Sequence, residues 1–403
     1  MFEGKTVVLG VSGGIAAYKA AQLASSLGKT GADVHVIMTK NACEFVSPLT
    51  FETLSKNRVS VDTFDRNFEY NVEHVALAKR ADVFLIAPAT ANVLAKIAAG
   101  IADDMLTTTF LAASCPKMVA PAMNTGMYEN PITQRNLETL REYGVTVLEP
   151  AEGLLACGDS GRGRLPEPEE LFEAVRFALT KKDMEGLSVL VTAGPTQEAI
   201  DPVRYITNHS TGKMGYEMAA AAARRGADVT LVTGPVGLAP APWIRKVVPV
   251  VSAAQMYDAV VSCAGEQDMV IKCAAVADYT PVQTAQDKIK KSDGETVLEL
   301  ARTKDILGTL GKNKPETQVL CGFSMETQNL VENSALKLEK KNADMIVANN
   351  LRDAGAGFGT QTNLVTLLTK TCAEKLPLMG KDAVSDAILD RLLEIWHRKN
   401  PGK

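Results

Sequence analysis

Three polar segments in the first half of the chain contain residues that could carry out chemistry. His74, one of only four histidines, stands directly after Glu73. Asn124 follows an apolar run predicted to be a buried strand, and ligands of α/β sheets bind where such strands end. Cys157 is surrounded by glycines, with two arginines close behind it, which is typical of a mobile lid rather than of a core cysteine. Each residue taken alone also has a structural interpretation, because single histidines and turn asparagines are common.

The second half contains a different set of polar residues. The loop that holds Arg204 and Asn208 runs over residues 201–215 and is too long for a simple connector. Asp278 follows another apolar run, and Lys288 lies beyond it in a lysine-rich stretch. Such a stretch is usually a solvated surface. Beside an acid it also fits the binding of a triphosphate, because lysines neutralise the leaving pyrophosphate and the acid helps to hold Mg²⁺. The P-loop pattern G-x-x-x-x-G-K-[ST] is absent.

Two similar units of supersecondary structure position these residues. Residues 6–14 are an apolar run that ends in glycines, and residues 188–196 repeat this pattern in the middle of the chain. Each run leads to a helix-like segment and then to a nearly identical strand, at residues 31–37 and 226–232. A glycine turn between a strand and a helix N-terminus forms an anion site, because unpaired backbone N–H groups point outward there. Two such sites indicate two phosphorylated ligands.

Apolar runs alternate with helical patterns along the whole chain, and most of them are continuously hydrophobic, as parallel strands buried on both faces are. We predict an α/β protein with two doubly wound, Rossmann-like, mostly parallel sheets in tandem. The first domain is expected over residues 1–180, a short polar linker over 181–187 and the second domain over 188–403. The predicted strands are 6–9, 34–38, 82–87, 117–120, 145–148, 189–192, 229–233, 269–273, 319–323, 345–348 and 364–368, and a last helix is predicted over 381–397.

The composition excludes several classes of function. A length of 403 residues is enough for two cores, and a net charge of −4 gives no support for binding to nucleic acid or to a membrane surface. No apolar stretch is long enough to span a bilayer, and the N-terminus does not resemble a signal peptide. The seven cysteines include no C-x-x-C pair, which favours a reducing compartment. We therefore expect a cytoplasmic enzyme.

The glycine turns favour mononucleotides over dinucleotides. The first turn, Gly10-Val11-Ser12-Gly13-Gly14, does not match G-x-G-x-x-G. The strand that follows it ends in Met38-Thr39-Lys40, and its counterpart in the second half ends in Thr233-Gly234-Pro235, so neither supplies an acid for a ribose 2′-OH. Hydroxyl groups and a lysine at these positions suit a phosphate group better.

Together, the features of the first half resemble the flavin-dependent cysteine decarboxylase family, and in particular its members that act on phosphopantothenoylcysteine. The glycine turn, His74, the Ala87–Asn92 segment, the Pro-Ala-Met-Asn motif and the Cys157 loop carry this resemblance. It implies that FMN is bound by Gly10, Ser12, Gly13, Gly14, Thr39, Ala89, Thr90 and Asn92, and that the substrate is bound by Met123 and Asn124.

The implied reaction solves a chemical problem, because an N-acylated cysteine has no electron sink for the loss of its carboxylate. Oxidation of CH₂–SH to a thioaldehyde places a C=S group β to the carboxylate, so that CO₂ can leave and give an enethiol. Reduction and protonation on carbon complete the reaction. By resemblance, Asn124 fixes the substrate carboxylate, His74 assists oxidation and decarboxylation, and Cys157 donates the final proton.

The second half resembles the phosphopantothenate–cysteine ligases, the usual bacterial fusion partners of these decarboxylases. Asn208, Lys288, the Phe323–Thr327 segment, and Lys337 with Lys341 carry this resemblance. It implies that CTP activates the carboxylate of 4′-phosphopantothenate as an acyl-cytidylate with release of pyrophosphate. The amine of L-cysteine then displaces CMP.

The ligase resemblance also assigns residue roles. Asn208 stabilises the acyl intermediate with Arg204 nearby, Lys288 neutralises phosphate charge, and Asp278 is a candidate ligand for Mg²⁺. The implied CTP site consists of Lys272, Cys273, Ala274, Ala275, Asp278, Lys288, Lys304, Asp305, Ile306, Leu307, Phe323, Lys337 and Lys341. The choice of cytosine over adenine rests on the resemblance alone.

The resemblance covers roughly residues 4–395 and predicts two consecutive reactions of coenzyme A biosynthesis, ligation and then decarboxylation to 4′-phosphopantetheine. One alternative is a tandem NAD(P)-dependent α/β oxidoreductase, which the missing ribose acid disfavours. Another is a non-catalytic FMN-binding regulatory protein, which the presence of Cys157 and Asn124 disfavours. The resemblance further implies a homo-oligomer with trimeric decarboxylase and dimeric ligase contacts, which a dodecamer satisfies, and in which His74 faces the flavin of a neighbouring subunit.

Overall fold

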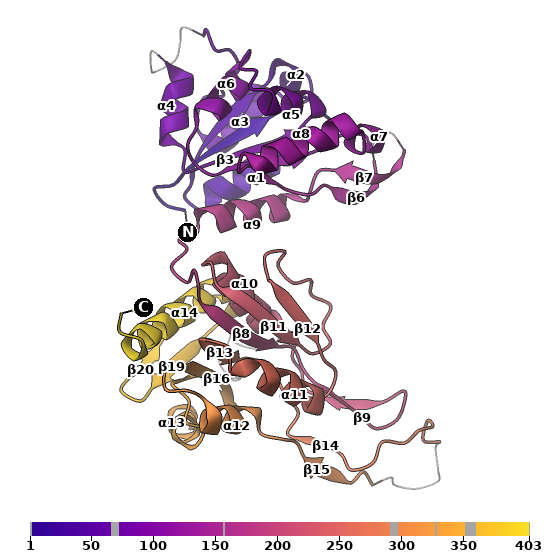
Figure 1. Ribbon diagram of the computed structural model, residues 1–403, viewed down its shortest axis with the longest axis vertical. Helices are drawn as coiled ribbons and strands as arrows, with labels where there is room; N and C mark the ends of the chain where they lie inside the picture. The colour runs from indigo at the N-terminus through magenta and orange to yellow at the C-terminus, as the bar shows by residue number, and fades with distance from the viewer. Residues whose placement is uncertain are drawn as a thin grey trace. The chain divides into compact units, whose positions relative to one another are not determined.

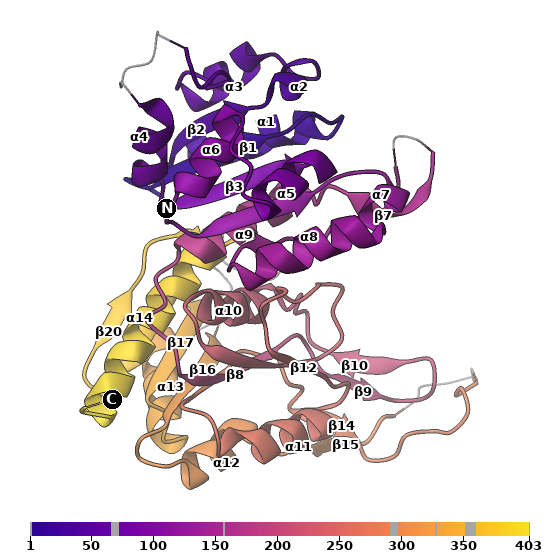
Figure 2. The ribbon, with the colours of Figure 1, turned by 45° about the horizontal axis from the view of Figure 1, so that its top comes forward.

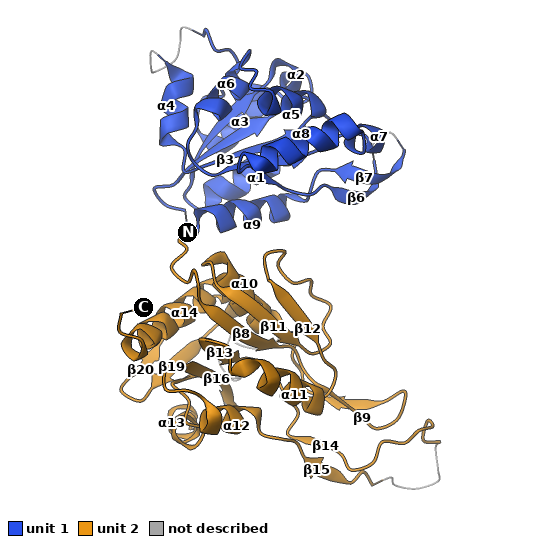
Figure 3. Ribbon diagram, in the orientation of Figure 1, with its two compact units in different colours: residues 1–180 blue, residues 181–403 orange. Residues whose placement is uncertain are grey.

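The structure is a computed structural model that describes residues 2–65, 72–155, 158–290, 297–326, 329–350 and 360–402. The chain divides into two compact units, residues 1–180 (unit 1) and residues 181–403 (unit 2), as Figure 3 shows. Each unit has its own central sheet with helices on both faces (Figure 1). This confirms the predicted α/β class and the predicted pair of doubly wound sheets.

Unit 1 contains a wholly parallel five-stranded sheet in the order β2-β1-β3-β4-β5. Helices α1, α3 and α9 cover one face through buried residues such as Leu23, Phe51 and Leu171, and α5, α6 and α8 cover the other (Figure 2). The elements are β1 (Thr6–Val11), α1 (Ala17–Lys29), β2 (Asp33–Met38), α2 (Lys40–Cys43), α3 (Pro48–Ser55), α4 (Glu73–Arg80), β3 (Val83–Ala89), α5 (Ala91–Ala98), α6 (Met105–Ala112), β4 (Lys117–Pro121), α7 (Thr125–Tyr128), α8 (Pro131–Glu142), β5 (Thr146–Val147), the hairpin β6 (Ala151–Leu154) and β7 (Ser160–Arg164), and α9 (Pro168–Leu179).

Unit 2 contains an eight-stranded sheet in the order β12-β11-β8-β13-β16-β17-β19-β20. The strands from β12 to β17 are parallel, and β19 and β20 extend the sheet with antiparallel pairs. Its strands are β8 (Ser188–Ala193), β9 (Gln197–Ala199), β10 (Tyr205–Thr207), β11 (Asp228–Thr233), β12 (Lys246–Pro249), β13 (Met269–Lys272), β14 (Tyr279–Pro281), β15 (Leu300–Arg302), β16 (Val319–Glu326), β17 (Met345–Asn350), β18 (Thr362–Asn363), β19 (Val365–Thr369), β20 (Ala373–Lys375) and β21 (Met379–Gly380). Its helices are α10 (Lys213–Arg224), α11 (Ala253–Ala264), α12 (Ile306–Asn313), α13 (Leu330–Lys340) and α14 (Lys381–Lys399).

Both sheets have a switch point, where the strand order reverses and the connections leave in opposite directions. In unit 1 this point lies between β1 and β3, and in unit 2 it lies between β8 and β13. Crevices for ligands form at such points, outside the carboxyl ends of the strands. The loops that follow these four strands are therefore where each functional site is expected.

All eleven predicted strands and the last predicted helix occur, with ends shifted by a few residues. The prediction missed β12 and the short hairpins, because these segments are exposed and lack a continuous apolar run. Among the described residues, no helix is long and apolar enough to cross a membrane.

Residues 181–187 do not form the free linker that their polar composition suggested, because they pack as part of unit 2. Met184 is fully buried in its core, and the backbone N–H of Met184 donates to the carbonyl of Arg225 at 2.9 Å. The Arg225 guanidinium forms ion pairs with Asp183 at 2.8 Å and with Asp390 on α14 at 2.7 Å. The charges of the segment therefore anchor it instead of keeping it in solvent.

Candidate functional site

A cavity of 1410 Å³ lies at the switch point of unit 1. The loops after β1, β2, β3 and β4 all contribute to its wall, as expected for a doubly wound sheet. Seven residues predicted from the sequence line it: Gly13, Gly14, Thr39, Thr90, Asn92, Met123 and Asn124. Residues that lie more than 100 positions apart in the chain are thus brought to one hollow.

Three other predicted residues shape the cavity from behind and do not line it. The hydroxyl of Ser12 is fully buried, donates to the carbonyl of Pro88 at 2.8 Å and accepts from the N–H of Thr90 at 2.9 Å. A side chain on Gly10 would lie 2.5 Å from a methyl group of Leu106, so only glycine fits. Ala89 is also fully buried. Ser12 therefore joins the loops that follow β1 and β3.

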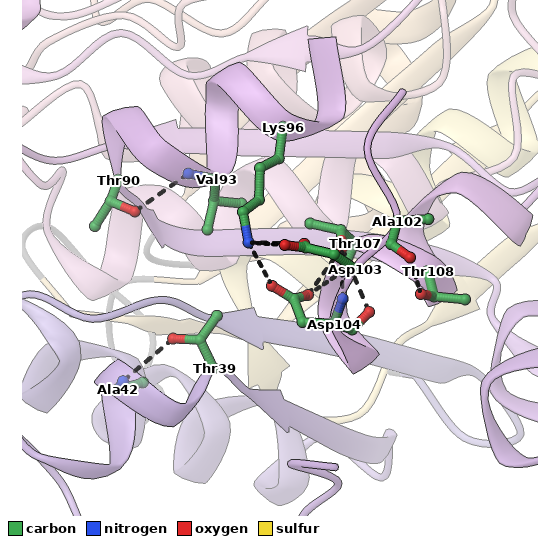
Figure 4. A network of polar contacts seen from close by, with 10 residues as sticks. All are labelled: Thr39, Ala42, Thr90, Val93, Lys96, Ala102, Asp103, Asp104, Thr107 and Thr108. Atoms are coloured by element: carbon green, nitrogen blue, oxygen red, sulfur yellow. Dashed lines mark hydrogen bonds and ion pairs between the residues drawn. The ribbon is translucent and has the colours of Figure 1, made fainter. Parts of the chain in front are cut away.

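Two threonines end the strands at the cavity and start the helices that follow. Thr39 accepts the N–H of Ala42 at 3.2 Å, and Thr90 accepts the N–H of Val93 at 3.5 Å (Figure 4). These N-caps fix the first turns of α2 and α5. A Cβ atom on Gly13 would overlap with Asn41, so the glycine lets the loop after β1 approach the start of α2 closely.

An ion-pair network on the cavity wall was not predicted from the sequence. The ammonium group of Lys96 contacts Asp103 at 2.7 Å and Asp104 at 3.3 Å, and all three residues line the cavity (Figure 4). The hydrogen bond to Asp103 raises the pKa of Lys96. Asp104 also caps α6 by accepting the N–H of Thr107 at 2.8 Å. The sequence signal was an acid in a capping position before α6, which alone does not indicate a cavity.

The hairpin β6–β7 packs against the loop that follows β4. The N–H of Met123 donates to the carbonyl of Gly163 at 2.9 Å. A Cβ atom on Gly163 would overlap with the carbonyl oxygen of Met123, and one on Gly161 would lie 2.8 Å from the side chain of Thr125. Two glycines in β7 therefore allow its backbone to lie directly on the Asn124 loop.

Two hydrogen bonds to described residues hold Asn124 at the cavity wall. Its Oδ1 accepts the N–H of Gly126 at 2.8 Å, which caps α7, and its Nδ2 donates to the carboxylate of Asp159 at 2.8 Å. The amide thus presents an N–H group that already binds a carboxylate. Cys157, predicted as the proton donor, lies outside the described residues. His74 lies half-buried in the first turn of α4 and is not among the lining residues of this cavity.

In unit 2, glycines bring the start of α10 to the carboxyl end of β8. A Cβ atom on Gly215 would lie 2.6 Å from that of Ala193, and one on Gly212 would lie 3.4 Å from the Cα atom of Gly194. Gly194 and Gly212 both have positive φ angles, 73° and 78°. Helix α10 therefore begins against the switch point, where its unpaired N–H groups favour an anion.

The predicted residues after β13 are fixed by buried threonines. Thr192 accepts the N–H of Ala274 at 3.0 Å, and Thr196 accepts the N–H of Ala277 at 3.0 Å. The amide of Asn208 donates to the carbonyl of Ala275 at 3.1 Å. The structure thus brings Asn208, Ala274 and Ala275 together at the switch point of unit 2, next to the loop after β8.

Lys272 is the last residue of β13 and Cys273 follows it, and the two side chains have opposite protonation preferences. Burial lowers the pKa of Lys272 to about 8, with a further contribution from Lys337, whereas Asp278 and Asp305 oppose the shift. Burial raises the pKa of Cys273 to about 12, although Lys272 and Lys381 oppose this shift. Near neutral pH the thiol is therefore neutral and the side chain of Lys272 is positively charged.

The predicted nucleotide residues on α12 and α13 form a connected group. Lys341 forms an ion pair with Asp305, which caps α12, and Lys337 donates to the carbonyl of Phe323 at 3.3 Å. Ile306 and Leu307 are buried in the core, so only their backbone is available to a ligand. The ammonium group of Lys304 lies 4.7 Å from the ring centroid of Tyr257.

Arg204 and Lys288 lie on an arm formed by β9–β10 and the segment after β14. The guanidinium of Arg204 donates to the carboxylate of Asp201 at 2.9 Å and to the carbonyl of Ile289 at 2.9 Å. The N–H of Ile289 also donates to Asp201, at 3.2 Å. In Figure 1 the hairpins of this arm extend from one end of unit 2. The described contacts therefore join Lys288 to Arg204 and Asp201 through its neighbour Ile289.

Within the described ranges, no cluster of three or more histidine, cysteine, aspartate or glutamate side chains could hold a metal ion. Asp278, the predicted ligand for Mg²⁺, is exposed at the switch point of unit 2. A single exposed carboxylate would need the oxygens of a bound phosphate group to complete the coordination of Mg²⁺.

Both halves of the chain match known protein families. Residues 1–180 match the family model described as Flavoprotein, and residues 184–395 match the model of the DNA/pantothenate metabolism flavoprotein C-terminal domain. A relative from Bacillus subtilis (strain 168), named Coenzyme A biosynthesis bifunctional protein CoaBC, is 50% identical over 396 residues, which cover 97% of this chain and 97% of that protein.

Two further comparisons cover smaller parts of the chain. A relative from an unknown prokaryotic organism, named Cysteine/Cysteine sulfinic acid decarboxylase, is 47% identical over 358 residues, which cover 87% of this chain and 100% of that protein. The crystal structure of the C-terminal domain of a Coenzyme A biosynthesis bifunctional protein CoaBC is 42% identical with a TM-score of 0.46. It covers 53% of this chain and 98% of that one.

Proposed function

We infer the function of this chain from its family: it belongs to the bifunctional proteins of coenzyme A biosynthesis. Unit 2 ligates 4′-phosphopantothenate to L-cysteine with CTP and Mg²⁺, and unit 1 decarboxylates the product to 4′-phosphopantetheine with FMN. The observation that carries this proposal is the pairing of two different switch-point sites, one in each unit, with two different family matches in the corresponding residues.

The residues around the cavity of unit 1 fit FMN. The backbone of Gly13 and Gly14 and the hydroxyls of Thr39 and Thr90 can hold a phosphate group, since N–H groups and hydroxyls at helix starts bind anions. Apolar side chains on the same wall, such as Met105, can pack against a flat ring. When bound, FMN supplies the oxidation of the cysteine side chain and the return of the hydride.

The chain's own residues then hold the substrate and supply the proton. The carboxylate of Asp159 occupies the position on Asn124 that the substrate carboxylate would take, so an incoming carboxylate would accept the same N–H group. Because β7 packs directly on this loop, the hairpin β6–β7 is anchored beside Asn124, and Cys157 lies between its two strands in the sequence. Cys157 donates the proton to carbon after CO₂ has left, and His74 assists the earlier steps from the side of a neighbouring subunit.

In unit 2 the amide of Asn208 holds the activated carboxyl group at the switch point, with Ala275 fixing its orientation. The lysines of the group formed by α12, α13 and β13 surround the nucleotide. Lys288 neutralises phosphate charge, and Arg204 acts beside it. Both residues lie on the arm, so we propose that the arm delivers them to the site of a neighbouring subunit.

Neither alternative gains support from a specific observation. The family matches cover residues 1–180 and 184–395 with flavoprotein models, in place of the NAD(P)-dependent oxidoreductase weighed from the sequence. A non-catalytic FMN-binding regulator would not need a second unit with its own nucleotide residues. The cytoplasmic location stays a prediction.

The deciding experiment follows both reactions in one purified protein. With 4′-phosphopantothenate, L-cysteine, CTP and Mg²⁺ we expect CMP, pyrophosphate and CO₂ in equal amounts, and the protein should be yellow. Lys288→Gln should stop CMP formation but leave decarboxylation of added 4′-phosphopantothenoylcysteine intact. Cys157→Ser should still release CO₂ but accumulate the enethiol. Decarboxylation of free cysteine in preference to 4′-phosphopantothenoylcysteine would refute the assignment of unit 1.

The proposed subunit contacts rest on exposed apolar side chains. Ile15, Tyr18 and Phe64 line the cavity of unit 1 and are 62%, 61% and 88% exposed. On the arm of unit 2, Val203 and Tyr205 are 59% and 51% exposed. We propose trimeric contacts in unit 1 and dimeric contacts in unit 2, which a dodecamer combines. Light scattering of the intact protein tests this, and a monomer at micromolar concentration would contradict it.

A further inference from the structure

Two long helices begin side by side at the carboxyl end of the sheet of unit 2. Helices α10 and α14 pack on the same face, where Ala219 and Val384 share one core, and they run next to each other in Figures 1 and 2. The start of α14 is fixed because the N–H of Lys381 donates to the carbonyl of Gln361 at 3.0 Å. Asn363 ties this region to α10 through a contact of 3.9 Å with the sulfur of Met214.

The side chain of Lys381, the first residue of α14, is buried between these helix starts. Only 6% of the residue is exposed, and its ammonium group has no hydrogen bond or ion pair with any residue in the part of the chain that the structure describes. A charge with so little contact with water is normally paired, because removing it from water without a partner is costly. Glu217 attracts this ammonium group electrostatically, and an anionic ligand would supply a direct partner for it.

The charged groups around Lys381 indicate the direction of its ammonium group. The charged and titratable groups that act on its ammonium are Lys213, Cys273 and Glu217. Lys213 begins α10, and Cys273 directly follows β13, so the ammonium lies toward the switch point. Glu217 on α10 and Asp382 on α14 are the nearby acids, and Asp382 packs against Gly380 at the start of its own helix. Two lysines and two helix starts thus face one strand end.

We propose that Lys381 binds the terminal phosphate groups of the nucleoside triphosphate, and hence the pyrophosphate that leaves. This inference rests on the ligase function proposed above and adds a residue on the α10–α14 face to it. The nucleotide residues predicted from the sequence on α12 and α13 pack on the other face of the sheet, in a separate core. A triphosphate that passes over the ends of β8 and β13 would therefore meet the nucleoside residues at one end and Lys381 at the other.

The charge balance of the reaction explains why a lysine is useful here. A carboxylate oxygen of the substrate forms a bond to the α-phosphorus, the bond from that phosphorus to the bridging oxygen breaks, and the electron pair leaves with pyrophosphate. Negative charge then grows on the β- and γ-phosphate groups. A fixed ammonium group and the N–H groups of two helix starts stabilise this charge without reorganisation.

The test compares phosphate-containing and phosphate-poor ligands on the intact protein. Lys381→Gln should weaken binding of inorganic pyrophosphate and of CTP, each with Mg²⁺, by about tenfold to a hundredfold, as expected for the loss of a charged hydrogen bond. Binding of CMP should change by less than about twofold, because CMP lacks the terminal phosphate groups. Lys381→Arg should retain most of the pyrophosphate affinity. Lys375→Gln, which removes an exposed lysine of β20, is the matched control.

Isothermal titration calorimetry separates the possible outcomes. Unchanged affinity of Lys381→Gln for pyrophosphate and CTP overturns the role of Lys381 and leaves the ligase function standing. An equal loss for CMP shows that Lys381 acts only on the fold, and this also overturns the proposal. If the unaltered protein binds neither CTP nor pyrophosphate, the ligase function itself fails. Should Lys381→Gln not fold, Lys381→Met provides the same comparison with an apolar side chain that suits its buried position.

Discussion

The contact between Gly163 and the Asn124 loop leads to a prediction that can be worked out from the structure. Gly163 has a φ angle of 139°, and a Cβ atom there would overlap with the carbonyl oxygen of Met123 and lie 3.3 Å from its carbonyl carbon. Heavy atoms of residues that are not adjacent in the chain are essentially never found within 3.0 Å of a Cβ atom. Gly163→Ala must therefore move the hairpin β6–β7 by about 1 Å, and a displacement of that size in a catalytic group can lower a rate about a hundredfold.

A matched control lies in the same hairpin connection. Gly158 also has a positive φ angle, 89°, but a Cβ atom there would meet nothing within 4 Å. Gly158→Ala therefore carries only the backbone cost of about 1–2 kcal/mol. Gly163→Ala carries a backbone cost of about 1–3 kcal/mol, because a φ angle of 139° is further from the values that other residues adopt, and about 1–3 kcal/mol from the overlap. The comparison separates the combined effect at Gly163 from the ordinary cost of an alanine in this hairpin.

Two assays measure this difference. Decarboxylation of 4′-phosphopantothenoylcysteine should fall about a hundredfold in Gly163→Ala, with FMN content unchanged, and much less in Gly158→Ala. Hydrogen exchange of the Met123 amide tests the geometry without any assumption about function, because this N–H donates to Gly163. It should lose protection only in Gly163→Ala. Equal rates and equal protection in both variants would show that the close approach of β7 to the Asn124 loop does not matter.

Three further predictions concern unit 2. Thr192→Val should destabilise unit 2 by about 1–3 kcal/mol in denaturant titrations, because the buried N–H of Ala274 loses its acceptor. The control Thr317→Val, at an exposed position, should have almost no effect. Met184→Ala should destabilise unit 2 by about 2–5 kcal/mol and leave the unfolding of unit 1 unchanged; an altered transition of unit 1 would contradict the assignment of residue 184 to unit 2. Folding lowers the pKa of Lys272 from 10.5 to about 8. Between these pH values the folded protein therefore binds fewer protons than the unfolded chain, so the free energy of unfolding should rise with pH. Lys272→Met, which lacks the titrating group, should not show this rise. Parallel pH profiles of the two proteins would refute the shift.

The strands of the central sheets could be predicted from the sequence, because short continuous apolar runs are typical of parallel strands that are buried on both faces. The position of Asn124 at the carboxyl edge of the sheet could be predicted in the same way, since it follows β4, whereas Asn208 directly follows the short strand β10, which the apolar pattern did not indicate. The behaviour of residues 181–187 could not be predicted in this way. Their polar composition is typical of a linker, and only the structure shows that Arg225, which also pairs with Asp390, supplies the partner of Asp183.

A sequence also does not show which residues support a site without contacting its cavity. Ser12 belongs to the glycine turn, so the sequence suggests a direct contact with a ligand, yet both functions of its hydroxyl are used within the protein. Lys96 shows the opposite case, because a lysine in the middle of a helix is ordinarily a solvated residue. Its place on the cavity wall depends on the loop that brings Asp103 back to it.

Each unit has a site at the carboxyl ends of its strands, but different elements pack against the two sites. In unit 1 the glycines of β7 remove side chains, so that the backbone of the hairpin β6–β7 can lie on the Asn124 loop at the wall of a largely apolar cavity. In unit 2 glycines at 194, 212 and 215 bring a helix start to the strand ends instead, and we propose that lysines near these ends supply charge. Apolar walls suit a flat ring that exchanges hydride, because they exclude water. Converging charge suits the departure of a polyanion, because the negative charge of pyrophosphate grows as the bond breaks. One topology can therefore serve two reactions, since the residues that distinguish them lie in the loops after the strands and not in the sheets.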